Sequence, residues 1–275
     1  MILTEQNYYS SEANWAYFSA SQFKSFDKCP ACAMAELTGE WTAPASEALV
    51  LGSYVDEMLT GTEASIRLFK VEHPELFNAR TGELKAAFRT AEETVERIRQ
   101  QPKMMEYLSG QHQVIMVGEI EGVPFKIKMD SFHPGRMIVD LKYMKSLRSP
   151  NAYIPMVQYW GYDVQGAIYQ EIVRQNTGDR LPFFLNVATK ENPARLALGE
   201  INQISLNAAL DRVRSNIVRH QRIKMGELPP RRCEAYDCDY CAATATVVEP
   251  IDTDFFGYSA AQLDEIRMYR GEGMQ

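Results

Sequence analysis

The sequence predicts an α/β fold whose middle part runs in the order helix, three-strand antiparallel meander, helix, strand, with added helices at both ends. Three observations carry this prediction. The first hundred residues are mainly helix formers, the pattern then changes to strand-like alternation broken by two turns, and a long helical stretch precedes an apolar strand. The chain has 275 residues, 45% of them hydrophobic, and can therefore bury a sizeable core.

The N-terminal part of the chain is predicted to be mainly helical. Ser19 suits the N-cap of a first helix over residues 19–37, and Pro30 is expected to kink or restart this helix. Further helices are predicted over 45–59 and from about 83 to 108, where Glu, Arg, Ala and Gln predominate.

The meander is predicted between residues 113 and 142. Its strand-like stretches are 113–121, 123–130 and 137–142. Gly122 and the pair Pro134-Gly135 supply the two turns. Apolar and polar residues alternate along the middle stretch, so one face of that strand carries Lys126, Lys128 and Asp130 in a row.

After the meander the element types alternate. A long helix is predicted over 156–176, where Thr177-Gly178 ends it. The apolar run 181–189 is typical of a strand buried in the middle of a sheet. Another helix is predicted over 205–224, before two consecutive prolines break the chain.

The net charge of −7 argues against a protein that binds a polyanion over a broad surface. The basic residues are nevertheless concentrated in two segments. Residues 123–148 contain six basic and two acidic residues, and residues 212–232 contain seven basic residues and one acidic residue. These segments are either nucleic-acid contacts or solvated helix and loop faces.

The sequence shows no sign of insertion into a membrane. No stretch approaches the roughly 18 consecutive apolar residues that a membrane-spanning helix needs. The N-terminus also lacks the basic and apolar regions of a signal peptide. We therefore expect a cytoplasmic protein.

Two carboxylates and an ammonium group are predicted to converge in the meander. Asp130 ends the second strand, while Asp140 and Lys142 lie two residues apart on the third and therefore on one face. Mg²⁺ and Mn²⁺ prefer oxygen ligands, so the two aspartates and the backbone carbonyl of Leu141 make a candidate site for one or two ions. A lysine beside such a site can orient the attacking water and stabilise transition-state charge. The set suits phosphodiester hydrolysis; the alternative is a surface ion pair on a hairpin.

The order of elements around this set resembles the PD-(D/E)xK nuclease superfamily. Asp130 and Asp140-Leu141-Lys142 match its motif, in which an aspartate ends the second strand of the meander and (D/E)xK lies on the third. The proline of the signature is absent. The resemblance implies a restriction-endonuclease-like core and metal-dependent hydrolysis of DNA, and it makes Lys126, Lys128 and Lys145 candidate DNA contacts.

Two further motifs resemble the branch that includes the nuclease domains of RecB-type helicases and phage recombination exonucleases. Gln165 and Tyr169 match its Q-x-x-x-Y signature and are expected to support the metal site and touch the DNA backbone. Asp56 follows a glycine by four residues, where this branch commonly has a histidine that binds the second cation. Carboxylate suits Mg²⁺ better than imidazole does. Glu57 and Glu119 are the alternatives for this position.

Over nearly its whole length the chain is similar to the RecE-like (exonuclease VIII) nucleases of phages and prophages. The stretches that carry this similarity are 19–29, 52–56, 118–142 and 160–174, with TGDRLPFF after the last. The resemblance implies degradation of linear duplex DNA from its ends in the 5′ to 3′ direction, in recombination. It also implies a single-strand annealing partner of RecT type and a homo-oligomer. The residues themselves do not distinguish an exonuclease from an endonuclease.

The five cysteines are clustered, which in a cytoplasmic chain favours a metal site over disulfides. Cys233, Cys238 and Cys241 lie within nine residues, and C-x-x-C is a common ligand pair for Zn²⁺ or an iron–sulfur cluster. The start of the chain resembles RecB-like domains in which one N-terminal cysteine joins three C-terminal ones around a [4Fe–4S] cluster. This implies Cys29 as the fourth ligand, with Cys32 as the alternative; structural zinc and free cysteines are the other interpretations.

The sequence is therefore interpreted as one nuclease domain. Its expected parts are an N-terminal helical part over 1–110, a catalytic core over 45–190 and a C-terminal helix with the cysteine segment over 205–245, within a single domain of residues 1–275. The rival hypothesis is a non-catalytic module, held by its metal–cysteine site, that binds nucleic acid or a replication protein.

Overall fold

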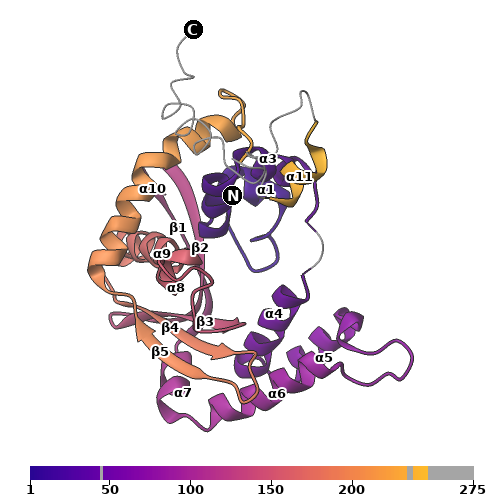
Figure 1. Cartoon of the computed structure of the whole chain (residues 1–275). Helices are drawn as coiled ribbons and strands as arrows, with labels where there is room; N and C mark the ends of the chain where they lie inside the picture. The colour runs from indigo at the N-terminus through magenta and orange to yellow at the C-terminus, as the bar shows by residue number, and fades with distance from the viewer. Residues whose placement is uncertain (44–45, 234–237, 247–275) are drawn as a thin grey trace. The chain divides into compact units, whose positions relative to one another are not determined.

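The computed structural model describes residues 1–43, 46–233 and 238–246 (Figure 1). The chain divides into two compact units. The first comprises Met1–Ala20 and Ala45–Ser215, and the second comprises Ser21–Pro44 and Asn216–Gln275. Three parts of the expected elements lie outside the described residues: 247–275 of the single domain, 234–237 of the cysteine segment, and the first residue of the helix expected over 45–59.

The first unit contains a five-stranded mixed sheet in the order β1-β2-β3-β4-β5. The strands are β1 (Gln111–Ile120), β2 (Val123–His133), β3 (Met137–Met144), β4 (Phe183–Thr189) and β5 (Leu196–Glu200). Only β3 and β4 are parallel. The predicted meander, the fourth strand and the restriction-endonuclease-like α/β class are confirmed. The edge strand β5 was not predicted, because its five residues, LALGE, give no clear alternation.

Helices cover both faces of this sheet. Helix α9 (Tyr162–Thr177) packs on β1 and β2, whereas α4 (Glu47–Thr60) packs on β3 (Figure 1). The core on the α4 side consists of buried apolar residues from α4, α6 (Ala86–Arg99), α7 (Pro102–Leu108), β3 and β4, among them Tyr54, Phe88, Ile98, Leu141 and Ala188. Burying a large apolar side chain of this kind contributes about 1.5–3 kcal/mol. This core holds α4 against β3, and side chains alternate along β3, so Asp140 and Lys142 face the α9 side.

Two of the predicted long helices are each divided into two. The helix predicted over 83–108 is interrupted before Pro102, which begins α7 because proline suits the first helical position. The helix predicted over 156–176 becomes α8 (Met156–Tyr159) and α9, separated by Gly161 at a φ of 62°. Helices α1 (Ser11–Ala16) and α5 (Glu63–Glu72) and the 3₁₀ turn η1 (Pro74–Leu76) were not individually predicted.

Strands β2 and β3 pair over a short length only. Their backbone register runs from His133↔Met137 to Ser131↔Val139 and stops there, whereas β3 and β4 pair over seven positions. Pairing therefore ends immediately before Asp130 and Asp140, which would be opposite each other in a continued ladder. The separation of the two strands leaves the Leu141 N–H free for a side-chain acceptor.

The N-terminal segment occupies the edge of β2 that β3 leaves open. Phe18 forms a bridge with Phe125, and its N–H donates to the Pro124 carbonyl at 2.8 Å. The same segment buries Lys126, which is 1% exposed and whose Nζ donates to Asn14 Oδ1 at 2.8 Å and to the Tyr8 carbonyl. The prediction that Lys126 contacts DNA is therefore corrected, because N-terminal residues that are far away in the sequence bury its side chain.

Gly166 allows α9 to approach the sheet and α10 (Gln203–Lys224) closely. A Cβ at this position would lie 2.9 Å from both Leu206 Cδ2 and Phe183 Cδ1. We expect Gly166→Ala to lower the free energy of unfolding by about 1 kcal/mol, because overpacking outweighs the gain in helix propensity. Gly52→Ala is the matched control: Gly52 lies within α4 with no atom within 4 Å of the added Cβ, so thermal unfolding should show no loss of stability. Equal effects of the two substitutions would contradict this packing argument.

The second unit joins two segments that are distant in the sequence. It contains most of α2 (Ala20–Lys28), α3 (Pro30–Thr38), the end of α10 and α11 (Asp239–Thr244). The helix predicted over 19–37 was expected to be either kinked or restarted at Pro30; it is restarted there, as α3. Phe23 and Phe26 are fully buried and their rings lie 5.3 and 5.9 Å from the ring of His220, centroid to centroid. Across the described residues, no helix combines the length and apolar character needed to cross a membrane.

Candidate active site

The predicted catalytic residues come together in a cleft of about 630 Å³ in the first unit. Its chemistry-bearing lining residues are Asp56 and Glu57 from α4, Lys128 and Asp130 from β2, Asp140, Leu141 and Lys142 from β3, and Gln165 and Tyr169 from α9. Helix α4, the strands β2 and β3 of the meander, and helix α9 therefore supply one site.

Asp130 is held by the backbone of the neighbouring strand. Its Oδ2 accepts a hydrogen bond from the Leu141 N–H at 2.9 Å. That N–H is available because β2 and β3 no longer pair at this point. This bond sets the position of the carboxylate and brings Asp130 beside the backbone of the D-x-K segment.

Asp140 is almost completely buried, at 2% exposed, and among the described residues its Oδ2 takes part in an ion pair but accepts no hydrogen bond. Gln165 Nε2 donates to Oδ1 at 2.6 Å, and Lys142 Nζ lies 2.6 Å from Oδ2. Burial disfavours the charged form of Lys142, but the carboxylates of Asp140 and Asp130 hold its pKa above the usual value. The Lys142 ammonium also lies 5.2 Å from the ring centroid of Tyr162. Lys142 is therefore a positioned cation beside two carboxylates.

Tyr169 and Gln165 contact the site from one face of α9. The buried Tyr169 hydroxyl donates to the Lys128 carbonyl at 2.9 Å, which fixes the backbone of β2 two residues before Asp130. Gln165 acts on β3 through Asp140. The Q-x-x-x-Y spacing thus lets one helix hold both strands where they diverge.

Asp56 and Glu57 bring two further carboxylates from α4. Gln113 Nε2 donates to Asp56 Oδ2 at 2.9 Å. Among the described residues, Asp56 Oδ1 and Glu57 Oε1 are buried and accept no hydrogen bond. A buried carboxylate oxygen without a donor is energetically costly unless a cation or solvent compensates it.

The accumulation of carboxylates disfavours their charged forms. Burial, with smaller contributions from Asp140 and Asp56, raises the pKa of Asp130 to about 8. Burial raises the pKa of Asp56 to about 6, although His112 and Lys128 oppose this change. A bound cation would stabilise the charged forms of these buried, neighbouring carboxylates.

The residues of the cleft fit a hard divalent cation. They offer carboxylate oxygens from three separate elements, three buried carboxylate oxygens (Asp56 Oδ1, Glu57 Oε1 and Asp140 Oδ2) accept no hydrogen bond, and the described lining contains no cysteine or histidine. Mg²⁺ and Mn²⁺ prefer oxygen ligands of this kind. Asp56, Asp130 and Asp140 are therefore the candidate ligands, together with the Leu141 carbonyl, and Glu57 stands beside them.

Other predicted residues lie elsewhere. Glu119 is on β1, where its backbone N–H donates to Gln175 Oε1, and it does not line the cleft. Lys145 is exposed beyond the end of β3 and also lies outside the lining. Lys128 does line the cleft, with its ammonium 4.7 Å from the ring centroid of Tyr9. Lys128 is thus the best placed of the three predicted DNA-contacting lysines.

Gln113 was not among the predicted site residues. The register of β1 and β2 passes from His112↔Ser131 to Val114↔Met129, so Gln113 stands opposite Asp130, with a φ of 53°. A positive φ is unusual for glutamine, and such positions concentrate at functional sites. The alternation of residues 113–121 does not mark this position, whose contact with Asp56 joins two residues that are 57 positions apart in the sequence.

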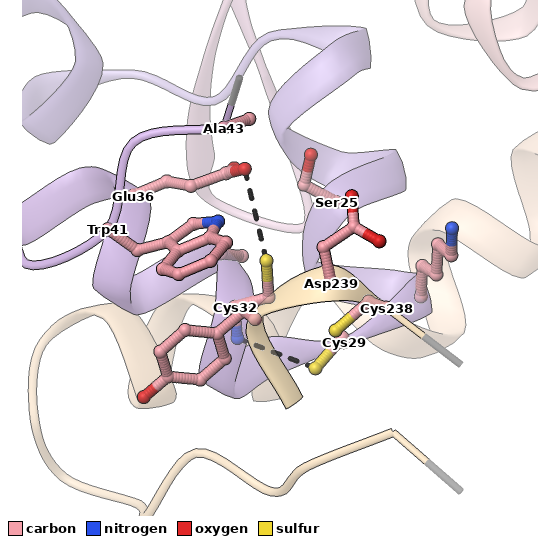
Figure 2. Close-up of a pocket in the computed structure, with 11 residues that line it drawn as sticks. Ser25, Cys29, Cys32, Glu36, Trp41, Ala43, Cys238 and Asp239 are labelled. Carbon is pink, nitrogen blue, oxygen red and sulfur yellow. Dashed lines mark hydrogen bonds between the residues drawn. The ribbon is translucent and has the colours of Figure 1, made fainter. Parts of the chain in front are cut away.

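Four of the five cysteines form a compact group in the second unit. The sulfurs of Cys29, Cys233, Cys238 and Cys241 all lie within 4.8 Å of one another. The sulfur of Cys32 instead lies 3.9 Å from Glu36 Oε1, one turn further along α3 (Figure 2). Of the two N-terminal cysteines that the sequence left open, Cys29 is therefore the one in the group.

Comparison with known proteins agrees with this geometry. Residues 19–244 match the family described as a PDDEXK-like domain of unknown function (DUF3799). The crystal structure of a candidate exonuclease from Eubacterium rectale is 44% identical to this chain, with a TM-score of 0.86, over 94% of this chain and 99% of that one. The structure of the protein SSO0001 aligns over 75% of this chain and 98% of that one at 14% identity and a TM-score of 0.33, and supports no inference. No curated protein matches the chain. Because the family match spans most of the sequence, the chain is a member of the DUF3799 family of PDDEXK-like domains.

Proposed function

We propose that this protein is a metal-dependent DNA exonuclease that degrades linear duplex DNA from its ends, in the 5′ to 3′ direction. Family membership and the similarity to a candidate exonuclease support nuclease activity. The observation that carries the proposal is the convergence of Asp130, Asp140 and Lys142 with Asp56 in one cleft.

The cation supplies one part of the chemistry. When bound by Asp56, Asp130, Asp140 and the Leu141 carbonyl, Mg²⁺ or Mn²⁺ would lower the pKa of a water molecule and neutralise phosphate charge. The protein supplies the remainder through preorganised groups. Lys142 orients the attacking water and stabilises negative charge that develops on the phosphate oxygens, and it needs no rearrangement to do so because Asp140 already holds it.

The helix after the meander keeps these groups in place. Gln165 orients the Asp140 carboxylate, and Tyr169 restrains β2 beside Asp130. Lys128 at the cleft can contact a phosphate of the strand, with Tyr9 beside its ammonium. This arrangement suits an in-line attack of water on a phosphodiester rather than a covalent mechanism, because the described lining contains no cysteine and no serine–histidine pair.

Duplex DNA labelled at one 5′ end, and closed circular DNA of the same sequence, test the proposal. With Mg²⁺ or Mn²⁺ we expect early release of the 5′ label from the linear molecule, and no product from the circle. EDTA should abolish the reaction. Release of the 3′ end first would overturn the polarity, and cleavage of the circle would identify an endonuclease instead.

The rival hypothesis, a non-catalytic module that binds nucleic acid or a replication protein, has one observation in its favour, the net charge of −7. It predicts DNA retention without a metal-dependent product in the same experiment. A RecT-type annealing partner and a homo-oligomer agree with an exonuclease that exposes single strands. Sedimentation of the pure protein, alone and with such an annealing protein, tests both.

A further inference from the structure

The spacing of the cysteine sulfurs in the second unit discriminates between metals. The sulfurs of Cys29 and Cys241 are 3.5 Å apart, and so are those of Cys233 and Cys238. All four lie within 4.8 Å of one another. A single zinc ion holds thiolates at about 2.3 Å, which places tetrahedrally arranged sulfurs about 3.8 Å apart. The group thus has the dimensions of a site for one ion.

A [4Fe–4S] cluster does not fit these dimensions. Each cysteine of a cubane binds a different iron, so the sulfurs are separated by the width of the cluster in addition to two iron–sulfur bonds. Four sulfurs within 4.8 Å leave no room for that body. The cluster that the resemblance to RecB-like domains implies is therefore disfavoured by the geometry of this chain.

The surrounding backbone is arranged for thiolates. Cys29 precedes α3 and accepts from the Cys32 N–H at 3.4 Å, and Cys238 precedes α11 and accepts from the Cys241 N–H at 3.4 Å. The Cys233 N–H adds a second donor to the Cys29 sulfur at 3.3 Å. N–H groups at helix starts stabilise negative charge on sulfur. Three backbone N–H groups, from Cys32, Cys233 and Cys241, thus donate to two sulfurs of the group.

We propose that Cys29, Cys233, Cys238 and Cys241 bind one structural zinc ion tetrahedrally, and that this protein holds no iron–sulfur cluster. Zinc is the divalent metal that suits four thiolates in this geometry, and it exceeds Fe²⁺ in affinity for such ligands. The ion links Cys29 to Cys233, Cys238 and Cys241, and so stabilises the second unit across more than 200 residues of sequence.

The metal content of the full-length wild-type protein tests this directly. We expect about one zinc per chain, and neither stoichiometric iron nor acid-labile sulfide, after purification without chelators both in air and without oxygen. Exchange with Co²⁺ should produce the visible absorption of tetrahedral thiolate cobalt. Iron and sulfide at about four per chain in the anaerobic sample would overturn the proposal. So would a metal-free protein whose mass is lower by two hydrogens for each sulfur pair, since that would indicate disulfides.

Two serine variants provide a matched comparison. Cys233 and Cys32 are both partly exposed. Cys233 is a member of the four-cysteine group, whereas Cys32 lies beside it. We expect Cys233→Ser to lower bound zinc at least about tenfold at a low free concentration, and Cys32→Ser to retain about one zinc per chain. The cavity lined by Cys29, Cys32 and Cys238 beside Trp41 gives chelators a route to the sulfurs (Figure 2). Zinc loss from the Cys32 variant alone would contradict the assignment. Nuclease activity is not needed for any of these measurements, so the proposal stands or falls independently of the proposed function.

Discussion

Lys142→Met is expected to lower the rate of DNA hydrolysis by about 10²–10³-fold at saturating Mg²⁺. The substitution preserves the approximate length of the side chain but removes the ammonium group that lies 2.6 Å from Asp140 Oδ2. The loss of one preorganised group that stabilises transition-state charge has an effect of this size. Single-turnover cleavage of end-labelled linear duplex measures it. A rate within threefold of wild type would remove Lys142 from the catalytic role.

The same variant has a second expected consequence. Without Lys142, the buried Asp140 carboxylate loses its counter-charge, which is expected to cost about 3 kcal/mol in the metal-free protein. Added Mg²⁺ should recover part of this loss, since the cation compensates the same carboxylates. Lys103→Met is the control, because Lys103 forms an exposed ion pair with Glu106 outside the cleft. It should change neither the rate nor the thermal stability measurably.

Asp130→Asn is expected to abolish metal-dependent cleavage and yet stabilise the metal-free protein at neutral pH. Asparagine can still accept the Leu141 N–H bond with its side-chain oxygen, but it carries no charge. It therefore removes a metal ligand and also the group whose ionisation the folded, metal-free cleft disfavours. We expect the free energy of unfolding at pH 7 to rise by about 1 kcal/mol or more, as is common where function maintains unfavourable groups.

The raised pKa of Asp130 predicts that the metal-free wild type loses stability as the pH rises. The pKa of Asp130 is about 8 in the folded protein, against an ordinary value of 3.8. Below about pH 4 the Asp130 carboxyl is protonated in both the folded and the unfolded chain, so its burial does not lower the free energy of unfolding. Between pH 4 and 8 the unfolded chain releases the proton more readily, and the metal-free wild type loses stability as the pH rises.

Thermal unfolding without added Mg²⁺ or Mn²⁺ across this pH range is the measurement; EDTA is left out because it would also compete for the proposed zinc. The wild type should lose stability from pH 5 to pH 8, whereas Asp130→Asn should show a flatter profile, and Mg²⁺ should reduce the difference. Asp211→Asn is the control, because the Asp211 side chain is 75% exposed and pairs only at the surface. A wild-type protein that becomes more stable with rising pH in the absence of Mg²⁺ and Mn²⁺ would contradict the electrostatic account of the cleft.

Local patterns predicted most of the elements that build the cleft. The alternation of residues 113–142 and its two turn signals correspond to β1, β2 and β3, and the apolar run after the long helix corresponds to β4. The pattern could not show where helices are interrupted inside a helical stretch, as at Gly161, or that a short edge strand follows β4. These features depend on how the segments pack and not on periodicity alone.

The sequence by itself determined the class of fold, the D-x-K spacing that puts Asp140 and Lys142 on one face, and the helical spacing of Gln165 and Tyr169. All of these follow from the period of two in strands and of 3.6 in helices. Only the tertiary structure decided that Lys126 is buried by the N-terminal segment, that Asp56 and not Glu119 faces the cleft, and that Cys29 and not Cys32 joins the sulfur group. Each of these depends on contacts between segments far apart in the chain, which local periodicity does not encode. The distances between the sulfurs, on which the zinc proposal rests, also depend on the tertiary structure. The sequence shows which residues are cysteines, but only folding sets how far apart their sulfurs lie.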